Sequence, residues 1–150
     1  MATKEEMISG ITVARRNAKL SRRLTAPDIE WWEEIRDEEI KPELERAAEA
    51  LSETGIGGKY ERRNGGSGVA LLAGGTYHLT FTHENGGIQV TSSEAHLNER
   101  WDDRKHVTTE AVGSKVMAFL VWIARVYPDA AETSIYDQRF KEGKPLLTTL

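Results

Sequence analysis

The clearest pattern in the chain is an alternation of hydrophobic and polar residues between positions 76 and 93. It is interrupted at Asn85-Gly86, a dipeptide typical of two-residue hairpin turns because both turn residues need positive φ. This turn would set hydrophobic residues opposite hydrophobic ones and polar residues opposite polar ones, as a correct register requires. The predicted pairs are His83 with Ile88, Thr82 with Gln89, Phe81 with Val90, and Thr80 with Thr91.

Glycine-rich segments divide the middle of the chain into short β-strands joined by short turns, which favours an antiparallel meander of about four strands. The strands are predicted at 59–63, 69–73, 76–83 and 88–93. Two points stay open. A tight turn at Gly74-Gly75 would put Val69 on the polar face of the sheet, whereas a three-residue loop would put it in the core. Residues 94–107 fit either an edge strand or a helix.

Helical spacing of apolar residues predicts helices on both sides of the strands. The first spans residues 4–23 and the second runs from 27 to about 54, where Gly55 ends it. Pro42 should kink the second helix near Ile40 or split it in two. A third helix, 108–127, is apolar on nearly every side and should be the core helix that lies on the sheet.

These elements predict a single two-layer α+β domain. Two N-terminal helices occupy residues 1–54, a four-stranded antiparallel meander occupies 55–107, and a buried helix occupies 108–128. Residues 129–150 have little periodicity and are expected to form an irregular tail.

The polar face of the predicted sheet has two interpretations. Antiparallel sheets commonly bury one face and expose the other to water. Alternatively, hydroxyl and amide groups on this face could bind a partner through adaptable hydrogen bonds. The residues concerned are His78, Thr80, Thr82, Gln89 and Thr91.

Composition narrows the setting without naming a function. The 150 residues contain no cysteine, which removes disulfides and thiol nucleophiles. The N-terminus is charged rather than apolar, and the most apolar stretch, 116–124, is far shorter than the ~20 residues that a membrane span needs. We therefore expect a cytoplasmic protein without a membrane partner.

Charge is distributed unevenly within the first third of the chain. Residues 1–26 carry a net charge of +4 and residues 27–54 a net charge of −8. Five cations share one face of the first helix and could bind phosphates of a nucleic acid: Arg15, Arg16, Lys19, Arg22 and Arg23. If the two helices pack together, however, the acidic helix would neutralise these cations and repel nucleic acid.

The acidic helix carries two apolar stripes on nearly opposite sides. Trp31 and Ile35 lie on one stripe, and Ile40 and Leu44 on the other. Either both stripes are buried, or the kink at Pro42 brings them into line, or Trp31 is an exposed aromatic anchor. In the last case the anchor and the carboxylates around it would bind a basic protein partner or a second copy. Those carboxylates belong to Glu30, Glu34, Asp37 and Glu38.

Candidate chemistry is sparse, and no cofactor is expected. One weak metal site would form if residues 94–107 were helical, because four possible ligands would share a face: His96, Glu99, Asp103 and His106. Neither the serine of Gly66-Ser67-Gly68 nor the glycines of residues 55–58 match a nucleophile elbow or a phosphate loop. The sequence thus favours a non-catalytic binding, inhibitor or adaptor protein, with a nucleic-acid-associated factor second and a metal-dependent enzyme third.

Overall fold

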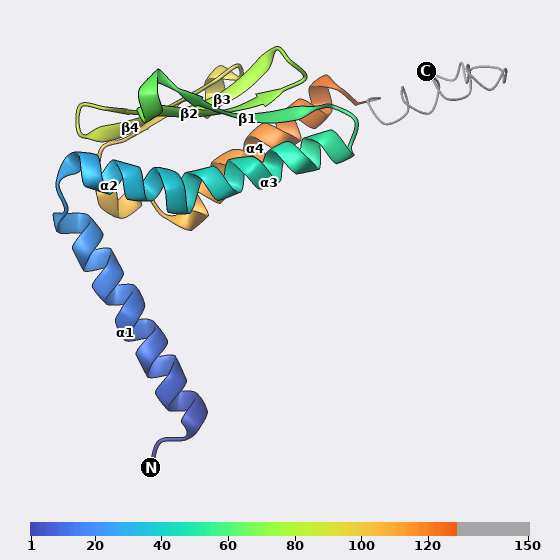
Figure 1. Ribbon diagram of the computed structural model, residues 1–150. Helices are drawn as coiled ribbons and strands as arrows, with labels where there is room; N and C mark the ends of the chain where they lie inside the picture. The colour runs from blue at the N-terminus through green and yellow to red at the C-terminus, as the bar shows by residue number, and fades with distance from the viewer. Residues whose placement is uncertain (129–150) are drawn as a thin grey trace, which may run out of the picture.

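In the computed structural model, residues 1–128 are described, and they form an α+β fold in two layers with one projecting helix (Figure 1). One layer is a five-stranded antiparallel sheet, and the other consists of helices packed on one face of that sheet. The predicted α+β class and antiparallel sheet are therefore confirmed. The predicted irregular tail, 129–150, lies outside the described residues.

The sheet is a simple meander in which each strand pairs with the next one in the sequence. Its strands are β1 (Gly58–Arg63), β2 (Gly68–Ala73), β3 (Tyr77–Glu84), β4 (Gly87–Ser92) and β5 (Glu99–Trp101). The register of β3 and β4 is the predicted one, with Phe81 opposite Val90 and Thr82 opposite Gln89. The fifth strand settles residues 94–107 as short turns of 3-10 helix around an edge strand.

The loop between β2 and β3 determines which face of β2 enters the core. Ala73 pairs with Tyr77, so three residues form the loop and the tight turn is excluded. Val69 consequently lies opposite Phe81, and both side chains are fully buried between sheet and helices.

Helix α4 (Thr109–Val126) packs on the sheet through one face. It begins at Thr108, whose side-chain oxygen accepts a hydrogen bond from the Ala111 N–H at 3.1 Å, a typical N-cap. Its buried residues are Val112, Val116, Phe119 and Ile123. The helix is less enclosed than its composition predicts, because Met117 and Val121 on its outer side are 60% and 44% exposed.

The second predicted helix is a continuous rod with a π-helical turn in the middle. Helix α2 (Asp28–Ile35) leads into the π turn η1 (Arg36–Ile40) and then into α3 (Lys41–Glu53). The turn ends at Ile40, two positions before Pro42, whose ring would clash with a carbonyl in a regular α-helix. The kink expected near Ile40 is thus a π turn.

This π turn brings the two apolar stripes of the rod into line. An extra residue in the turn rotates α3 back by about 100° relative to α2. As a result, one face of the rod carries both stripes, and the large apolar side chains on this face are buried: Trp31, Ile35, Ile40, Leu44 and Leu51. Of the interpretations open for this helix, burial of both stripes by realignment is the correct one.

Helix α1 (Lys4–Thr25) is joined to the body at its C-terminal end, and its N-terminal end projects away (Figure 1). The side-chain oxygen of Thr3 caps its start by accepting from the Glu6 N–H at 3.1 Å. Arg23 is its only buried residue. The fold therefore presents almost the whole helix to solvent.

Candidate functional site at the base of the first helix

The exposed aromatic anchor predicted at Trp31 and Ile35 does not exist in the monomer. Both side chains are only 1% exposed. The guanidinium of Arg104 lies 4.9 Å from the centre of the Trp31 ring and covers it. The prediction was wrong because the periodicity of α2 alone does not reveal the π turn or a cation supplied from residue 104.

The neighbouring Trp32 is buried for a separate reason. Its indole N–H donates to the carbonyl of Gly66 at 2.8 Å, and its ring stacks on His83 with the ring centres 5.3 Å apart. His83 in turn contacts the Asp28 carboxylate at 2.8 Å. These contacts fix α2 on the turn between β1 and β2.

The basic partner of the acidic helix is the chain's own first helix. Arg23 forms ion pairs with Glu34, Glu38 and Glu39 on the rod. Arg22 pairs with Glu34 at 2.6 Å, and Lys19 pairs with Glu38 at 2.9 Å. The acidic ring predicted to attract a foreign partner is thus largely neutralised from within.

The two remaining predicted acids lie apart from this cluster. Asp37 pairs with the adjacent Arg36, whose Nε lies 2.8 Å from a carboxylate oxygen of Asp37. Glu30 is exposed and forms no ion pair within residues 1–128. Neither residue takes part in the junction between α1 and the rod.

The junction shifts the pKa values of its ionisable groups. Hydrogen bonds from Arg22 lower the pKa of Glu34 despite some opposing effect of burial. Burial acts to raise the pKa of Glu39, but hydrogen bonds from Thr109 and Arg23 outweigh it and the pKa is lowered. Both carboxylates are therefore held in their charged form.

Arg104 ties α1 to the body through the backbone. Its guanidinium donates to the carbonyl of Arg23 at 3.2 Å and to that of Ala26 at 2.7 Å, and also to the Asp28 carboxylate at 3.3 Å. The five N–H groups of a guanidinium allow it to donate to several acceptors at once. Sequence reasoning missed this residue, because its partners lie about 80 positions away and no local pattern connects them.

A cleft of about 760 Å³ opens above this junction, between α1, α2 and the start of α4. Apolar side chains form part of its lining: Leu20, Leu24, Trp31, Ile35 and Val107. Arg15, Arg16 and Lys105 lie at its edges and are exposed. Within the described part of the chain, none of these three cations forms an ion pair.

The first helix therefore keeps only part of its predicted basic face for an outside ligand. Lys19, Arg22 and Arg23 are in ion pairs with the rod, as expected if the two helices touch. Arg15 and Arg16 remain exposed. The buried Trp31 and Ile35 and the residues of the predicted basic face thus surround one cleft.

Comparison with known proteins finds no matching family model, no similar curated protein and no similar solved structure. None of the described helices is long and apolar enough to cross a membrane. The candidate site must therefore be judged from its own geometry.

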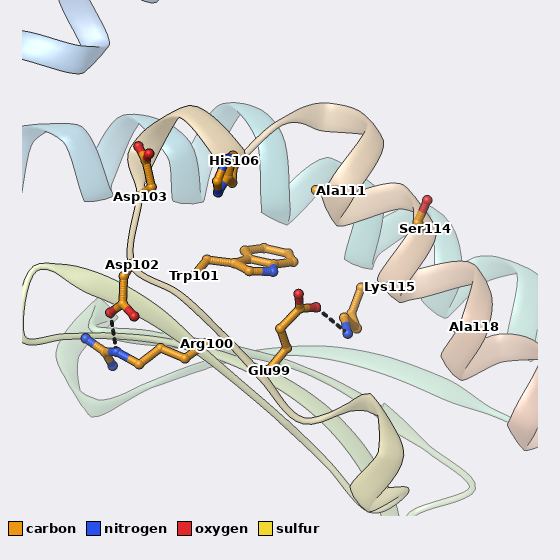
Figure 2. Close-up of a pocket in the computed structure, with 10 residues that line it drawn as sticks. All are labelled: Glu99, Arg100, Trp101, Asp102, Asp103, His106, Ala111, Ser114, Lys115 and Ala118. Carbon is orange, nitrogen blue, oxygen red and sulfur yellow. Dashed lines mark hydrogen bonds and ion pairs between the residues drawn. The ribbon is translucent and has the colours of Figure 1, made fainter.

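The predicted metal ligands do not converge. Figure 2 shows a second cleft, of about 650 Å³, with Asp103 and His106 on one side of Trp101 and Glu99 on the other. Glu99 instead pairs with Lys115 at 2.7 Å. His96 does not line this cleft and contacts Glu94 at 2.7 Å.

The cause is that residues 94–107 form short turns and a strand rather than a helix. Across residues 1–128, no group of three or more His, Cys, Asp or Glu side chains is placed to hold a metal ion. Arg100 and Asp102, which also line the second cleft, form an ion pair at 2.6 Å. Together with the pair of Glu99 and Lys115, four of the charged side chains of this cleft therefore neutralise one another.

The polar face of the sheet lies opposite the helical layer. Thr80 is 7% exposed, and its hydroxyl lies 3.5 Å from the Arg63 guanidinium. Burial, together with the nearby positive charge of Arg63, lowers the pKa of His78. Thr82, Gln89 and Thr91 are partly exposed. This geometry is compatible with either interpretation of the face.

Proposed function

We propose that the chain is a small, cytoplasmic, non-catalytic binding protein that acts through a protein–protein surface, and that α1 is the element that meets the partner. The class of function is the one the sequence favours, but the surface differs. The exposed side chains of the projecting helix α1, and not the buried Trp31, form the proposed binding surface.

One observation carries the proposal: α1 holds large apolar side chains in water. Four in its first half, Met7, Ile8, Ile11 and Val13, are each 50–57% exposed. At 100° per residue, Met7, Ile8 and Ile11 share one face about 100° wide, and Val13 lies on the opposite side. Helices in proteins gain most of their stability by packing an apolar face, and contiguous exposed apolar surface marks interaction sites. A partner that covers this helix would remove the cost of exposing it.

The test compares two double variants in capture from an extract of the native host. Ile8→Glu/Ile11→Glu should lose the captured protein while circular dichroism stays unchanged, because both positions are exposed and Glu is a good helix former. The matched control, Met117→Glu/Val121→Glu, alters equally exposed apolar residues on α4 and should retain it. Equal losses, or retention by the α1 variant, would refute the proposal.

Light scattering supplies the second readout of the same variants. If the wild-type chain dimerises and Ile8→Glu/Ile11→Glu abolishes the dimer, the partner on α1 is a second copy. If the chain is monomeric, the partner is a different protein.

A nucleic-acid-associated role is the second candidate, favoured by Arg15 and Arg16, which are exposed and form no ion pair with any of residues 1–128. It predicts binding to DNA or RNA that weakens steeply with salt. Arg15→Glu should abolish such binding. Salt-insensitive binding, or none, would end this alternative.

A further inference from the structure

We infer that the cleft at the base of α1 binds an acidic, amphipathic helix of a partner protein. This inference rests on the proposed function and names the chemistry of the partner. It depends on the floor, the rim and the length of the cleft.

The floor of the cleft is apolar and partly open. Leu20 and Leu24 of α1 are 47% and 40% exposed, although they face the body across the cleft. Opposite them lie Trp31, Ile35 and Val107, each at most 6% exposed. A row of apolar side chains from a partner would cover both leucines and complete the packing, as in other helix-in-groove complexes.

The rim of the cleft carries net positive charge that the described part of the chain does not neutralise. Arg15 and Arg16 line one side, and Lys105 lines the other. Glu110 is the only opposing carboxylate at the rim that lacks an ion pair within residues 1–128, since Glu39 is paired with Arg23. A partner helix with carboxylates beside its apolar row would match these charges.

The length of the surface fits a helix rather than a small ligand. At 100° per residue, Ile8 shares a line along α1 with three cleft residues, Thr12, Arg15 and Lys19. These three residues are polar, and Leu20 and Leu24 lie about 120° and 160° around the helix from Ile8, so Ile8 is not part of the apolar floor. The cleft itself extends along α1 from Thr12 to Leu24, which is about 18 Å at 1.5 Å per residue. A partner helix of about 16 residues would span it.

The probe is a synthetic 16-residue peptide with leucines on one helical face and glutamates on the other positions. Its control has lysine in place of every glutamate. The full chain should bind the glutamate peptide at least tenfold more tightly than the lysine peptide in fluorescence anisotropy, with affinity that falls as salt is added.

Variants of the chain assign that binding to the cleft. Arg15→Glu/Arg16→Glu should weaken binding of the glutamate peptide at least tenfold, and Leu20→Gln should weaken it without changing the thermal midpoint. Lys59→Glu/Arg125→Glu makes the same charge change on exposed residues of β1 and α4 and should bind normally.

The inference is overturned if both peptides bind alike, if neither binds, or if the cleft variants match wild type. It is also overturned if a DNA duplex binds more tightly than the peptide, or if a dimer of the chain excludes it. These failures would leave the capture result for Ile8→Glu/Ile11→Glu unaffected, so they are distinguishable from failure of the proposed function.

Discussion

At the scale of single residues, Trp31 illustrates how burial can come from distant parts of a chain. In the sequence, the apolar stripe to which Trp31 belongs has no apparent partner, because no residues close to it in the chain could cover that side of α2. The residues that enclose it, Arg104 and Val107, follow the last strand of the sheet in the sequence, about 75 positions later. Trp31 therefore stabilises the fold and forms part of the floor of the cleft.

Replacing Trp31 should accordingly unfold the protein rather than only abolish binding. Trp31→Ala removes a fully buried indole and should lower the free energy of unfolding by about 3–5 kcal/mol. Ile29→Ala, two residues away and 57% exposed, should change it by less than about 0.5 kcal/mol. Urea unfolding measures both. A stable, well-folded Trp31→Ala variant would contradict the assigned burial.

Glycine 58 provides a second test at this scale, because β1 lies very close to α3 there. A Cβ at Gly58 would sit 2.6 Å from the carbonyl oxygen of Ala48 and 2.9 Å from the Cβ of Leu51. Gly58→Ala should therefore destabilise the fold by about 1–3 kcal/mol through overpacking.

The matched change is Gly113→Ala in α4, where an added Cβ would meet, apart from the helix's own backbone, no atom of residues 1–128 within 4 Å. It should stabilise the fold by about 0.5–1 kcal/mol, since alanine favours the helix. Thermal unfolding compares the two variants. Equal effects would show that β1 and α3 are not packed as closely as described.

At the scale of elements, the π turn explains how one continuous helical rod buries both of its apolar stripes on the same face. Ile40 follows Ile35 by five positions, one more than the four of a regular α-helical stripe, and the turn absorbs the extra residue. It also relieves the clash that Pro42 would cause in a regular helix. The spacing of the apolar residues and the proline thus require the same local distortion.

Changes of helix length test this explanation. Deleting Asp37 together with Pro42→Ala should yield a regular helix that keeps the stripe continuous, with the midpoint of urea unfolding close to that of wild type. Inserting one alanine after Asp37 should instead rotate Trp31 and Ile35 by about 100° away from Ile40 and markedly lower the midpoint. Tolerance of the insertion would contradict the phase argument.

The sequence predicted elements better than it predicted surfaces. The first four strands and the register at Asn85-Gly86 depend on nearby residues, and they are as expected. The exposure of Trp31 and the partners of Arg104 depend on segments that meet only in the folded chain. The candidate site was therefore predicted as two separate surfaces, although its residues surround one cleft.

At the scale of the whole molecule, α1 is attached to the body only at its C-terminal end. Its position relative to the body depends on Arg104 and on the ion pairs of Arg23, because the rest of the helix is exposed. The cleft exists only while this junction holds. Conditions that break the junction should consequently change the shape of the molecule before they unfold its core.

Acid should do this, and the sign follows from the pKa values of Glu34 and Glu39. Both lie below the ordinary value of 4.5 in the folded chain. Their contribution to stability is therefore complete above pH 4.5 and is lost as the pH falls through the lowered values. Docking of α1 should be firm at neutral pH and weaken progressively below pH 4.5.

The measurement uses the absence of cysteine from the sequence, which lets two introduced thiols carry spin labels uniquely. Labels at Ser9→Cys on α1 and Lys59→Cys on the sheet should give one narrow distance distribution at pH 7 and a broad one at pH 3. Glu34→Gln/Glu39→Gln should already broaden it at pH 7. A distance distribution that stays narrow in acid, while the sheet remains intact, would mean that these ion pairs do not fix the position of α1.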